Sequence, residues 1–317
     1  MKGIVSYLPE HTAIPFMRRR MIGFIISALL IVLGTGDMLL QGLNLGIDFR
    51  GGILLEIKTP EPADLSQMRR DISNLDLGEI NLQEFGADDV VLIRIQRQEG
   101  EEDAQAAAID RVKEALGSEI EIRRQEFVGP QVGRELIKAG LLSILFSLGG
   151  IMIYIWFRFE WQFAVAAVLA LLHDTIATVA LFSLTQMEFN LSTVAAVLMI
   201  AGYSINDTVV VFDRMRENLR KYKRESLITI IDRSLNETLT RTLLTSGTTL
   251  VALAALWIFG GEVIRGFTIA LIWGIAVGTY SSIFIAAPML IFLKLRPEQL
   301  SRVSGEKADS DGTVAQS

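Results

Sequence analysis

The stretch "GYSINDTVVVFDRMREN" (202–218) places an amide and a carboxylate, Asn206 and Asp207, inside an otherwise apolar segment. A charged side chain at the centre of a bilayer costs about 2.5–3.5 kcal/mol. About six residues separate Asp207 from the basic residues that follow, which puts it roughly 9 Å inside a membrane at the helical rise per residue. We therefore expect Asp207 to face the interior of a helix bundle and to have a function there.

A cationic partner for Asp207 is available in the next apolar segment. "NETLTRTLLTSGTTL" (236–250) is too polar to face lipid, and Arg241, Thr245 and Thr248 or Thr249 share one helical face. A nearby guanidinium favours the ionised form of a carboxyl group, whereas burial favours the protonated form. Movement of Arg241 would therefore switch Asp207 between holding and releasing a proton, which predicts a proton relay. A purely structural ion pair that locks the two helices together is an equally weighted alternative.

A second intramembrane acid, Asp174, follows His173 near the middle of another apolar segment. We favour a satisfied polar contact between helices for Asp174. The alternative is a proton shuttle that uses His173. Asp174, Asn206 and Thr245 are therefore predicted as secondary polar residues of the site.

The composition is that of a membrane protein with a sizeable polar part. Of 317 residues, 50% are hydrophobic and 21% are charged, and the net charge of −6 argues against nucleic acid as a partner. Cysteine is absent from the sequence, which excludes disulfide and zinc–thiolate chemistry. We predict no metal and no cofactor, with protons as the coupling ion.

Six stretches are long and apolar enough to cross a bilayer. They cover residues 21–40, 137–157, 163–184, 192–212, 241–259 and 266–293. The first follows three arginines and lacks a cleavage site, so it is interpreted as a retained anchor rather than a signal peptide.

The distribution of Lys and Arg predicts the orientation. Basic residues crowd residues 1–20, the connection between the fourth and fifth spans, and the segment after the sixth span. Because positive charge stays on the cytoplasmic side, both termini are predicted to be cytoplasmic and residues 41–136 to face outward. The tail, residues 294–317, is polar and expected to be disordered.

The outward segment has the pattern of a small α+β domain. Strands are predicted at 51–58, 79–85, 89–96 and 119–128, and helices at 62–75 and 102–117. The order β-α-β-β-α-β is that of a ferredoxin-like fold. The segment contains no histidine and no catalytic constellation, so we expect a domain that binds or moves.

Small residues recur every four positions in the sixth span. Gly274, Gly278 and Ser282 lie on this stripe, which would let another helix approach closely. The pattern predicts helix packing and carries no chemistry. Gly149 and Gly150 in the second span permit the same close approach.

Four long motifs resemble the SecF members of the SecD/SecF family of bacterial protein-export membrane proteins. They are "LNLGIDFRGG" (43–52), "AGYSINDTVVVFDRMREN" (201–218), "SLNETLTRTLLTSGTTL" (234–250) and "FTIALIWGIAVGTYSSIFIAAPML" (267–290). The first resembles the motif that opens the outward domain and includes Gly46, Asp48, Phe49, Gly51 and Gly52. The resemblance covers about residues 20–295.

The resemblance implies half of a transporter of the resistance–nodulation–division (RND) type in the bacterial cytoplasmic membrane, with SecD supplying the other half. Further implied partners are the SecYEG channel, unfolded preprotein and other small Sec subunits. The pair would use proton flow, not enzymatic catalysis, to promote late translocation and release of preproteins. The family's proton pathway implies roles for Asp207 and Arg241, together with an Asp from SecD.

Two other functions remain open. The chain could be half of an exporter of small molecules or lipids, which would need an apolar pocket in the outward domain. It could also be a structural factor that holds translocase subunits together, in which case an apolar pair would replace Asp207 and Arg241 without loss.

Overall fold

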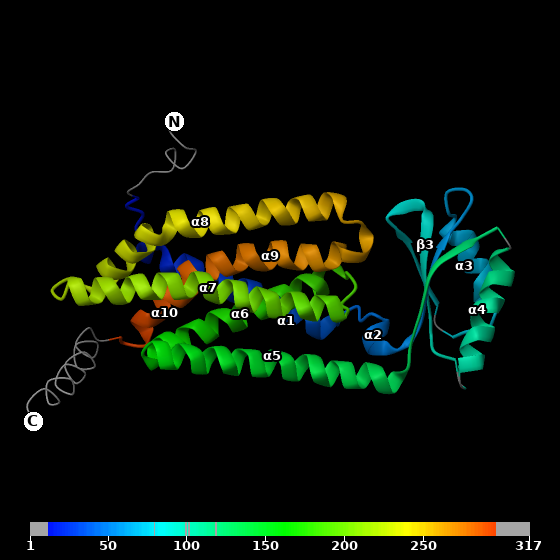
Figure 1. The fold of residues 1–317 in the computed structure, drawn as a ribbon, viewed down its shortest axis with the longest axis horizontal. Coiled ribbons are helices and arrows are strands. Elements are labelled where there is room, and N and C mark those ends of the chain that lie inside the picture. The colour runs from blue at the N-terminus through cyan, green and yellow to red at the C-terminus, as the bar shows by residue number, and fades with distance from the viewer. Residues whose placement is uncertain (1–11, 79, 99, 101, 118, 296–317) are drawn as a thin grey trace, which may run out of the picture.

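The computed structural model describes residues 12–78, 80–98, 100, 102–117 and 119–295. A bundle of long helices lies next to a small sheet domain, and the two are joined through α2 and α5 (Figure 1). Six helical segments among the described residues are long and apolar enough to cross a membrane, which confirms the predicted number of spans. The helical elements of the bundle are α1 (Arg20–Leu40), α5 (Pro130–Arg158), α6 (Trp161–Thr185), α7 (Leu191–Lys221), α8 (Leu227–Phe259), α9 (Arg265–Ser281) and α10 (Ala287–Phe292).

Several helices extend beyond the predicted apolar spans. The largest extension is in α8, which begins at Leu227 rather than near residue 241. The Ser226 side chain accepts a hydrogen bond from the Thr229 N–H and so caps its first turn. Ile230, Ile231 and Leu235 are buried in this extension, so its packing is apolar although its surface is charged.

The sixth span, Arg265–Phe292, is one membrane-length helix as predicted, but it contains a π-helical turn that the sequence pattern does not indicate. A π-helical turn, η4 (Ser282–Ala286), separates α9 from α10. Pro288 follows within the first turn of α10 and has no N–H to donate to a carbonyl one turn earlier. The wider turn occurs where this hydrogen bond is missing, and α10 lies at the end of the bundle away from the sheet domain (Figure 1).

The sheet domain confirms the predicted β-α-β-β-α-β order. Its elements are β1 (Gly52–Lys58), α3 (Leu65–Ser73), β2 (Ile80–Phe85), β3 (Ala87–Ile95), α4 (Glu102–Leu116) and β4 (Glu121–Val128). The sheet order is β2-β3-β1-β4, and every neighbouring pair is antiparallel. Both helices cover the face that points away from the bundle (Figure 1).

The two faces of this sheet have different environments. Ile53, Leu55 and Ile57 of β1 alternate with Leu54 and pack under α3 and α4. Leu54 points to the opposite face, where it clusters with Ile47 of α2 (Ile47–Arg50). The face toward the bundle therefore combines this small apolar cluster with charged residues such as Arg94 and Arg124.

The predicted small-residue stripe packs α9 closely against α7. A Cβ atom on Gly274 would overlap the buried Ile200 side chain, and one on Gly278 would lie 3.0 Å from the Ser204 Cβ. At Gly149 and Gly150, by contrast, no described atom lies within 4 Å of the added Cβ. The structure thus places close packing at Gly274 and Gly278 and leaves Gly149 and Gly150 in open space.

Gly274→Ala is expected to lower the free energy of unfolding by about 1–3 kcal/mol, because Ile200 is β-branched and buried and has little freedom to move. Thermal unfolding of the purified chain in detergent measures the effect. Gly149→Ala is the matched control, and it should leave stability unchanged or raise it by up to about 1 kcal/mol. Equal losses in the two variants would contradict this packing.

Candidate functional site

Asp207 lies in the interior of the bundle, on the face of α7 that meets α8. Only 3% of the residue is exposed. The Ser246 hydroxyl of α8 donates a hydrogen bond to its Oδ2 over 3.3 Å, and the same hydroxyl lies 2.8 Å from the Thr279 hydroxyl of α9. Among the described residues, no Lys or Arg forms an ion pair with this carboxylate. A buried carboxyl group held by a hydroxyl can exist in either protonation state.

The predicted partner, Arg241, lies on a different face of α8. The buried face of α8 carries Ser234, Thr238, Thr242 and Ser246 at four-residue spacing. Arg241 and Thr245 are exposed on the other side, with Thr248. No ion pair joins Arg241 to Asp207 among the described residues, although the sequence predicts Arg241 as its cationic partner.

Asn206 is exposed, although it is adjacent to Asp207 in the sequence. Successive helical residues point about 100° apart, so burial of Asp207 turns Asn206 away from the bundle interior. The structure does not bring Asn206 into the site.

Asp174 of α6 is more completely buried than Asp207, with 1% of the residue exposed. Its Oδ2 accepts hydrogen bonds from the hydroxyls of Ser204 (2.6 Å) and Ser281 (2.9 Å), and Nδ1 of His173 lies 3.1 Å from Oδ1. The contact therefore joins α6 to α7 and α9. This is the interhelical polar contact that the sequence analysis favours for Asp174.

A short segment of the sixth span supplies hydroxyls to three neighbouring helices. Thr279 contacts Ser246 of α8, Ser281 contacts Asp174 of α6, and Ser282 lies 2.9 Å from the Thr208 hydroxyl of α7. The sequence analysis treats Ser282 only as a small packing residue and misses Thr279, Ser281 and Ser246. The four-residue spacing from Ser234 to Ser246 is the signal that could have identified the buried face of α8.

The residues of the "LNLGIDFRGG" motif join the sheet domain to the bundle. Gly46 donates its N–H to the Phe189 carbonyl, and the Asp48 side chain accepts from the Leu191 N–H at the start of α7. Phe49 is buried, and its ring lies 6.0 Å from that of Phe189. The motif thus fixes the sheet domain on the connection between α6 and α7.

The two glycines that end the motif have backbone conformations open to few other residues. Gly51 has φ 73° and Gly52 has φ 125°. A Cβ on Gly52 would also collide with the Ile95 carbonyl of β3. These constraints explain a double glycine where the chain leaves α2 and enters β1.

An ion pair adds a second connection between the domain and the bundle. Arg94 of β3 bonds to Glu188, which lies between α6 and α7, and their side chains are only 13% and 22% exposed. Burial raises the pKa of Glu188 above its usual value, although the charge of Arg94 opposes the shift. The desolvation of this carboxylate thus outweighs its attraction to Arg94.

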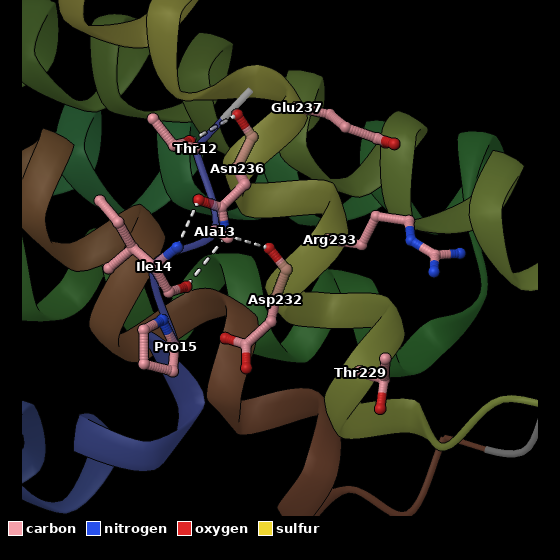
Figure 2. A pocket seen from close by; sticks show the side chains of 9 residues that line it. All are labelled: Thr12, Ala13, Ile14, Pro15, Thr229, Asp232, Arg233, Asn236 and Glu237. Atoms are coloured by element: carbon pink, nitrogen blue, oxygen red, sulfur yellow. Dashed lines mark hydrogen bonds between the residues drawn. The ribbon is translucent and has the colours of Figure 1, made fainter. Parts of the chain in front are cut away.

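Two open cavities lie outside the carboxylate region. One of about 400 Å³ forms where residues 12–15 cross α8, and Figure 2 shows that the Asn236 amide pairs with both backbone groups of Ile14. The other, of about 570 Å³, lies between the open face of the sheet and the bundle. Among the described residues, no cluster of three or more His, Asp and Glu residues could hold a metal ion.

Comparison with known families matches most of the chain. Residues 108–296 match the family described as "Protein export membrane protein SecD/SecF, C-terminal", and residues 38–59 match "SecD/SecF GG Motif". The chain is 46% identical to the protein translocase subunit SecF of Rickettsia bellii, covering 89% of this chain and 94% of the relative. It is 45% identical to that of Desulfurispirillum indicum, covering 89% and 92%.

Two solved structures have the same fold. The crystal structure of SecDF from Thermus thermophilus, a translocon-associated membrane protein, superposes with a TM-score of 0.81 at 32% identity. SecDF in a super-membrane-facing form gives a TM-score of 0.66 at 32% identity. The matches cover 93% and 94% of this chain but only 40% of each SecDF chain.

Because burial raises the pKa of Glu188, replacement of Arg94 and replacement of Glu188 should affect docking of the sheet domain differently. Arg94→Leu leaves a desolvated carboxylate unpaired and should weaken docking of the sheet domain by about 2 kcal/mol. Glu188→Gln resembles the protonated form and should leave the domain docked. Because docking raises this pKa, proton uptake favours the docked state, so acidification should restore docking in Arg94→Leu.

Spin labels at Ser73→Cys and Leu184→Cys can report domain position, since the chain has no native cysteine. Distances measured at a series of decreasing pH values follow protonation of this carboxyl group. Arg124→Leu, which breaks the ion pair to Glu126 inside the sheet domain, is the control. If Arg94→Leu and Glu188→Gln weakened docking of the sheet domain equally, the expected difference between the two variants would be wrong.

Proposed function

Because the chain belongs to the SecD/SecF family of protein-export membrane proteins, we propose that it is a SecF subunit whose Asp207 carries protons to drive late steps of preprotein export. It would act with SecD beside the SecYEG channel, in the bacterial cytoplasmic membrane, with both termini cytoplasmic. Its function would be that of an accessory transport subunit and not an enzyme. Proton flow would promote late translocation and release of the preprotein on the outer side.

The observation that carries this proposal is the environment of Asp207. The carboxyl group is buried in a six-span bundle and contacts a hydroxyl, with no cation in ion-pair contact among the described residues. Loss or gain of a proton there changes the charge in a region of low polarity, so it changes the packing energy of α7 against α8. A proton crossing ~100 mV supplies about 2.3 kcal/mol to such a change.

The exposed polar face of α8 supports a membrane partner. Arg241, Thr245 and Thr248 are exposed in a segment apolar enough to span the bilayer. A guanidinium facing lipid is costly, so a second protein must cover this face. SecD fits this role, since the solved SecDF chains are more than twice as long as this one, and an acid from SecD would pair with Arg241.

The contacts at the α6–α7 connection provide a route from the bundle to the sheet domain. Asp48 and Glu188 tie α2 and β3 to the start of α7, the helix that carries Asp207. In addition, α5 leads directly from β4 into the bundle through Gly129. Movement of α7 would thus be transmitted to the domain, which would hold and release the emerging chain.

An exporter of small molecules is the second candidate. The cavity of about 570 Å³ has Ile47, Leu54, Phe85 and Leu92 among its lining residues, and this is the apolar pocket that such a function needs. Arg124, Glu126 and Glu188 also line it, so the site is partly charged. An uptake assay with apolar substrates in inverted vesicles separates the two functions.

Asp207→Asn tests the proposal directly. The change keeps size and hydrogen bonding but removes the exchangeable proton, so release of a secreted protein should fall by about tenfold or more. Pulse-labelling of cells that lack their own copy and contain normal SecD measures this. Asn206→Ala, next to it but exposed, should export normally. Normal export by Asp207→Asn would overturn the proton role.

Double replacement of Asp207 and Arg241 by Leu separates transport from scaffolding. We expect the complex with SecD to assemble and export to fail, because an apolar pair fills the space but carries no proton. Co-purification of SecD and release of a secreted protein are the two readouts. Full export by the double variant would favour the structural assembly factor.

A further inference from the structure

We propose that Asp174 and His173 form a second proton-binding site in the bundle, separate from Asp207, with Ser204 and Ser281 as positioning residues. The inference extends the proposed proton-driven function to a further group. The first observation is the carboxylate of Asp174 in the middle of α6, which is 1% exposed and has no role in the proposed Asp207 pathway. At the helical rise, residue 174 lies roughly 15–20 Å from either end of α6.

The carboxylate receives different donors on its two oxygens. Nδ1 of His173 lies 3.1 Å from Oδ1, whereas the hydroxyls of Ser204 and Ser281 donate to Oδ2. His173 is therefore placed to exchange a proton with Oδ1, while the two serine hydroxyls hold Oδ2 in position. Gly278 makes room for this arrangement, since a Cβ there would lie 3.1 Å from the Ser204 Oγ and 3.5 Å from the Asp174 Oδ2.

The second observation concerns Nε2 of His173, the ring nitrogen that does not face Asp174. His173 is 7% exposed, and its Nε2 is buried without a hydrogen-bond partner among the described residues. When Nδ1–H donates to Asp174, the tautomer leaves a bare lone pair at Nε2. A buried polar atom without a partner is unfavourable. The Nε2 lone pair of an imidazole whose Nδ1–H donates to a carboxylate can accept a proton.

The proton balance of the site is simple. One proton adds to Nε2 of His173, and the proton on Nδ1 moves to Oδ1 of Asp174. The products are a neutral imidazole protonated at Nε2 and a neutral carboxylic acid, so the site gains one proton and no electrons move. Return of the proton on Oδ1 to Nδ1, with loss of the proton on Nε2, resets the site.

The surroundings contain few other titratable groups. The helices packed against α6 are α1, α5, α7 and α9, with η4 and α10. From α9, the Tyr280 ring lies 6.3 Å from that of His173, and its hydroxyl donates to the Gly23 carbonyl of α1. On α7, Asp207 is one turn beyond Ser204 but bonds to α8. Tyr203 of α7 is half-buried, and its hydroxyl donates to Thr249 of α8. The other described charged or titratable residues of these elements lie toward helix ends or on the surface; they include Arg20, Asp37, Arg134, Glu135, Lys138, Tyr154 and Arg158.

Two contacts link this site to that of Asp207. Ser281 bonds to Asp174 while Thr279, two residues earlier on α9, bonds to the Ser246 that holds Asp207. Ser282 begins the π-helical turn directly after Ser281. A change of charge at either carboxyl group therefore alters a hydroxyl contact of the same stretch of α9, which couples the two protonation events.

Nitrogen-15 NMR of the histidines tests the site without an export assay. The chain has only two histidines, so His11→Gln assigns the signal of His173 in the full chain assembled with SecD in lipid bilayers. We expect the Nδ1–H tautomer before the site takes up a proton and a proton at Nε2 afterwards, as the pH is lowered stepwise. In Asp174→Asn this pH-dependent change of tautomer should be lost, because no carboxylate remains to accept the Nδ1 proton.

The control is Thr178→Val, which removes a buried hydroxyl that bonds only to the Asp174 backbone carbonyl and should leave the spectrum unchanged. Proton-driven export should fall by about tenfold in Asp174→Asn and stay normal in Thr178→Val. A His173 that keeps one tautomer at every pH, or takes up its proton equally in Asp174→Asn, overturns the proposal. Asp207→Asn should preserve the His173 spectrum, so normal export by that variant would overturn the proposed function alone.

Discussion

The removal of carboxyl groups from water, without a cation in contact to compensate, is the constraint on which the rest of the bundle depends. Asp207 and Asp174 are both buried, and hydroxyls of neighbouring helices supply their main contacts. Ionisation of a carboxyl group costs more in such surroundings than in water, and the proposed proton role depends on this cost. The close packing of α9 at Gly274 and Gly278 brings these hydroxyls within reach of both carboxyl groups.

A small set of contacts attaches the sheet domain to the same helices. Asp48 accepts from the first N–H of α7, and Glu188 pairs with Arg94 just before that helix begins. The double glycine of Gly51 and Gly52 lets β1 start directly after α2. The helix that carries Asp207 therefore begins at the attachment point of the domain, so the proposed change of charge at Asp207 would reach the domain through α7.

Much of this architecture is predictable from the sequence, for physical reasons. The bilayer demands long apolar helices, so six spans can be recognised, and alternating residues identify the four strands. Burial of Asp207 and Asp174 follows from the cost of exposing a carboxylate to lipid. The buried face of α8 is indicated only by the four-residue spacing from Ser234 to Ser246, because Ser and Thr occur on both faces and Arg241 lies on the face that does not contact Asp207.

Other features depend on contacts between distant residues or on local backbone geometry. Arg94 and Glu188 are 94 positions apart, and no sequence pattern in either segment indicates that they pair. The π-helical turn before Pro288 leaves the apolar pattern of the sixth span intact, so periodicity alone shows a continuous helix. The unpartnered nitrogen of His173 likewise becomes visible only when its neighbours are placed.

The most direct test of the central claim is proton flux itself. The chain reconstituted with SecD in sealed proteoliposomes, with a pH-sensitive dye inside and an imposed potential, reports whether protons pass through the bundle. The account predicts inward flux for the wild-type complex and loss of that flux in Asp207→Asn, with the complex still assembled. Equal flux in the two complexes would contradict the assignment of Asp207 as the proton-carrying group.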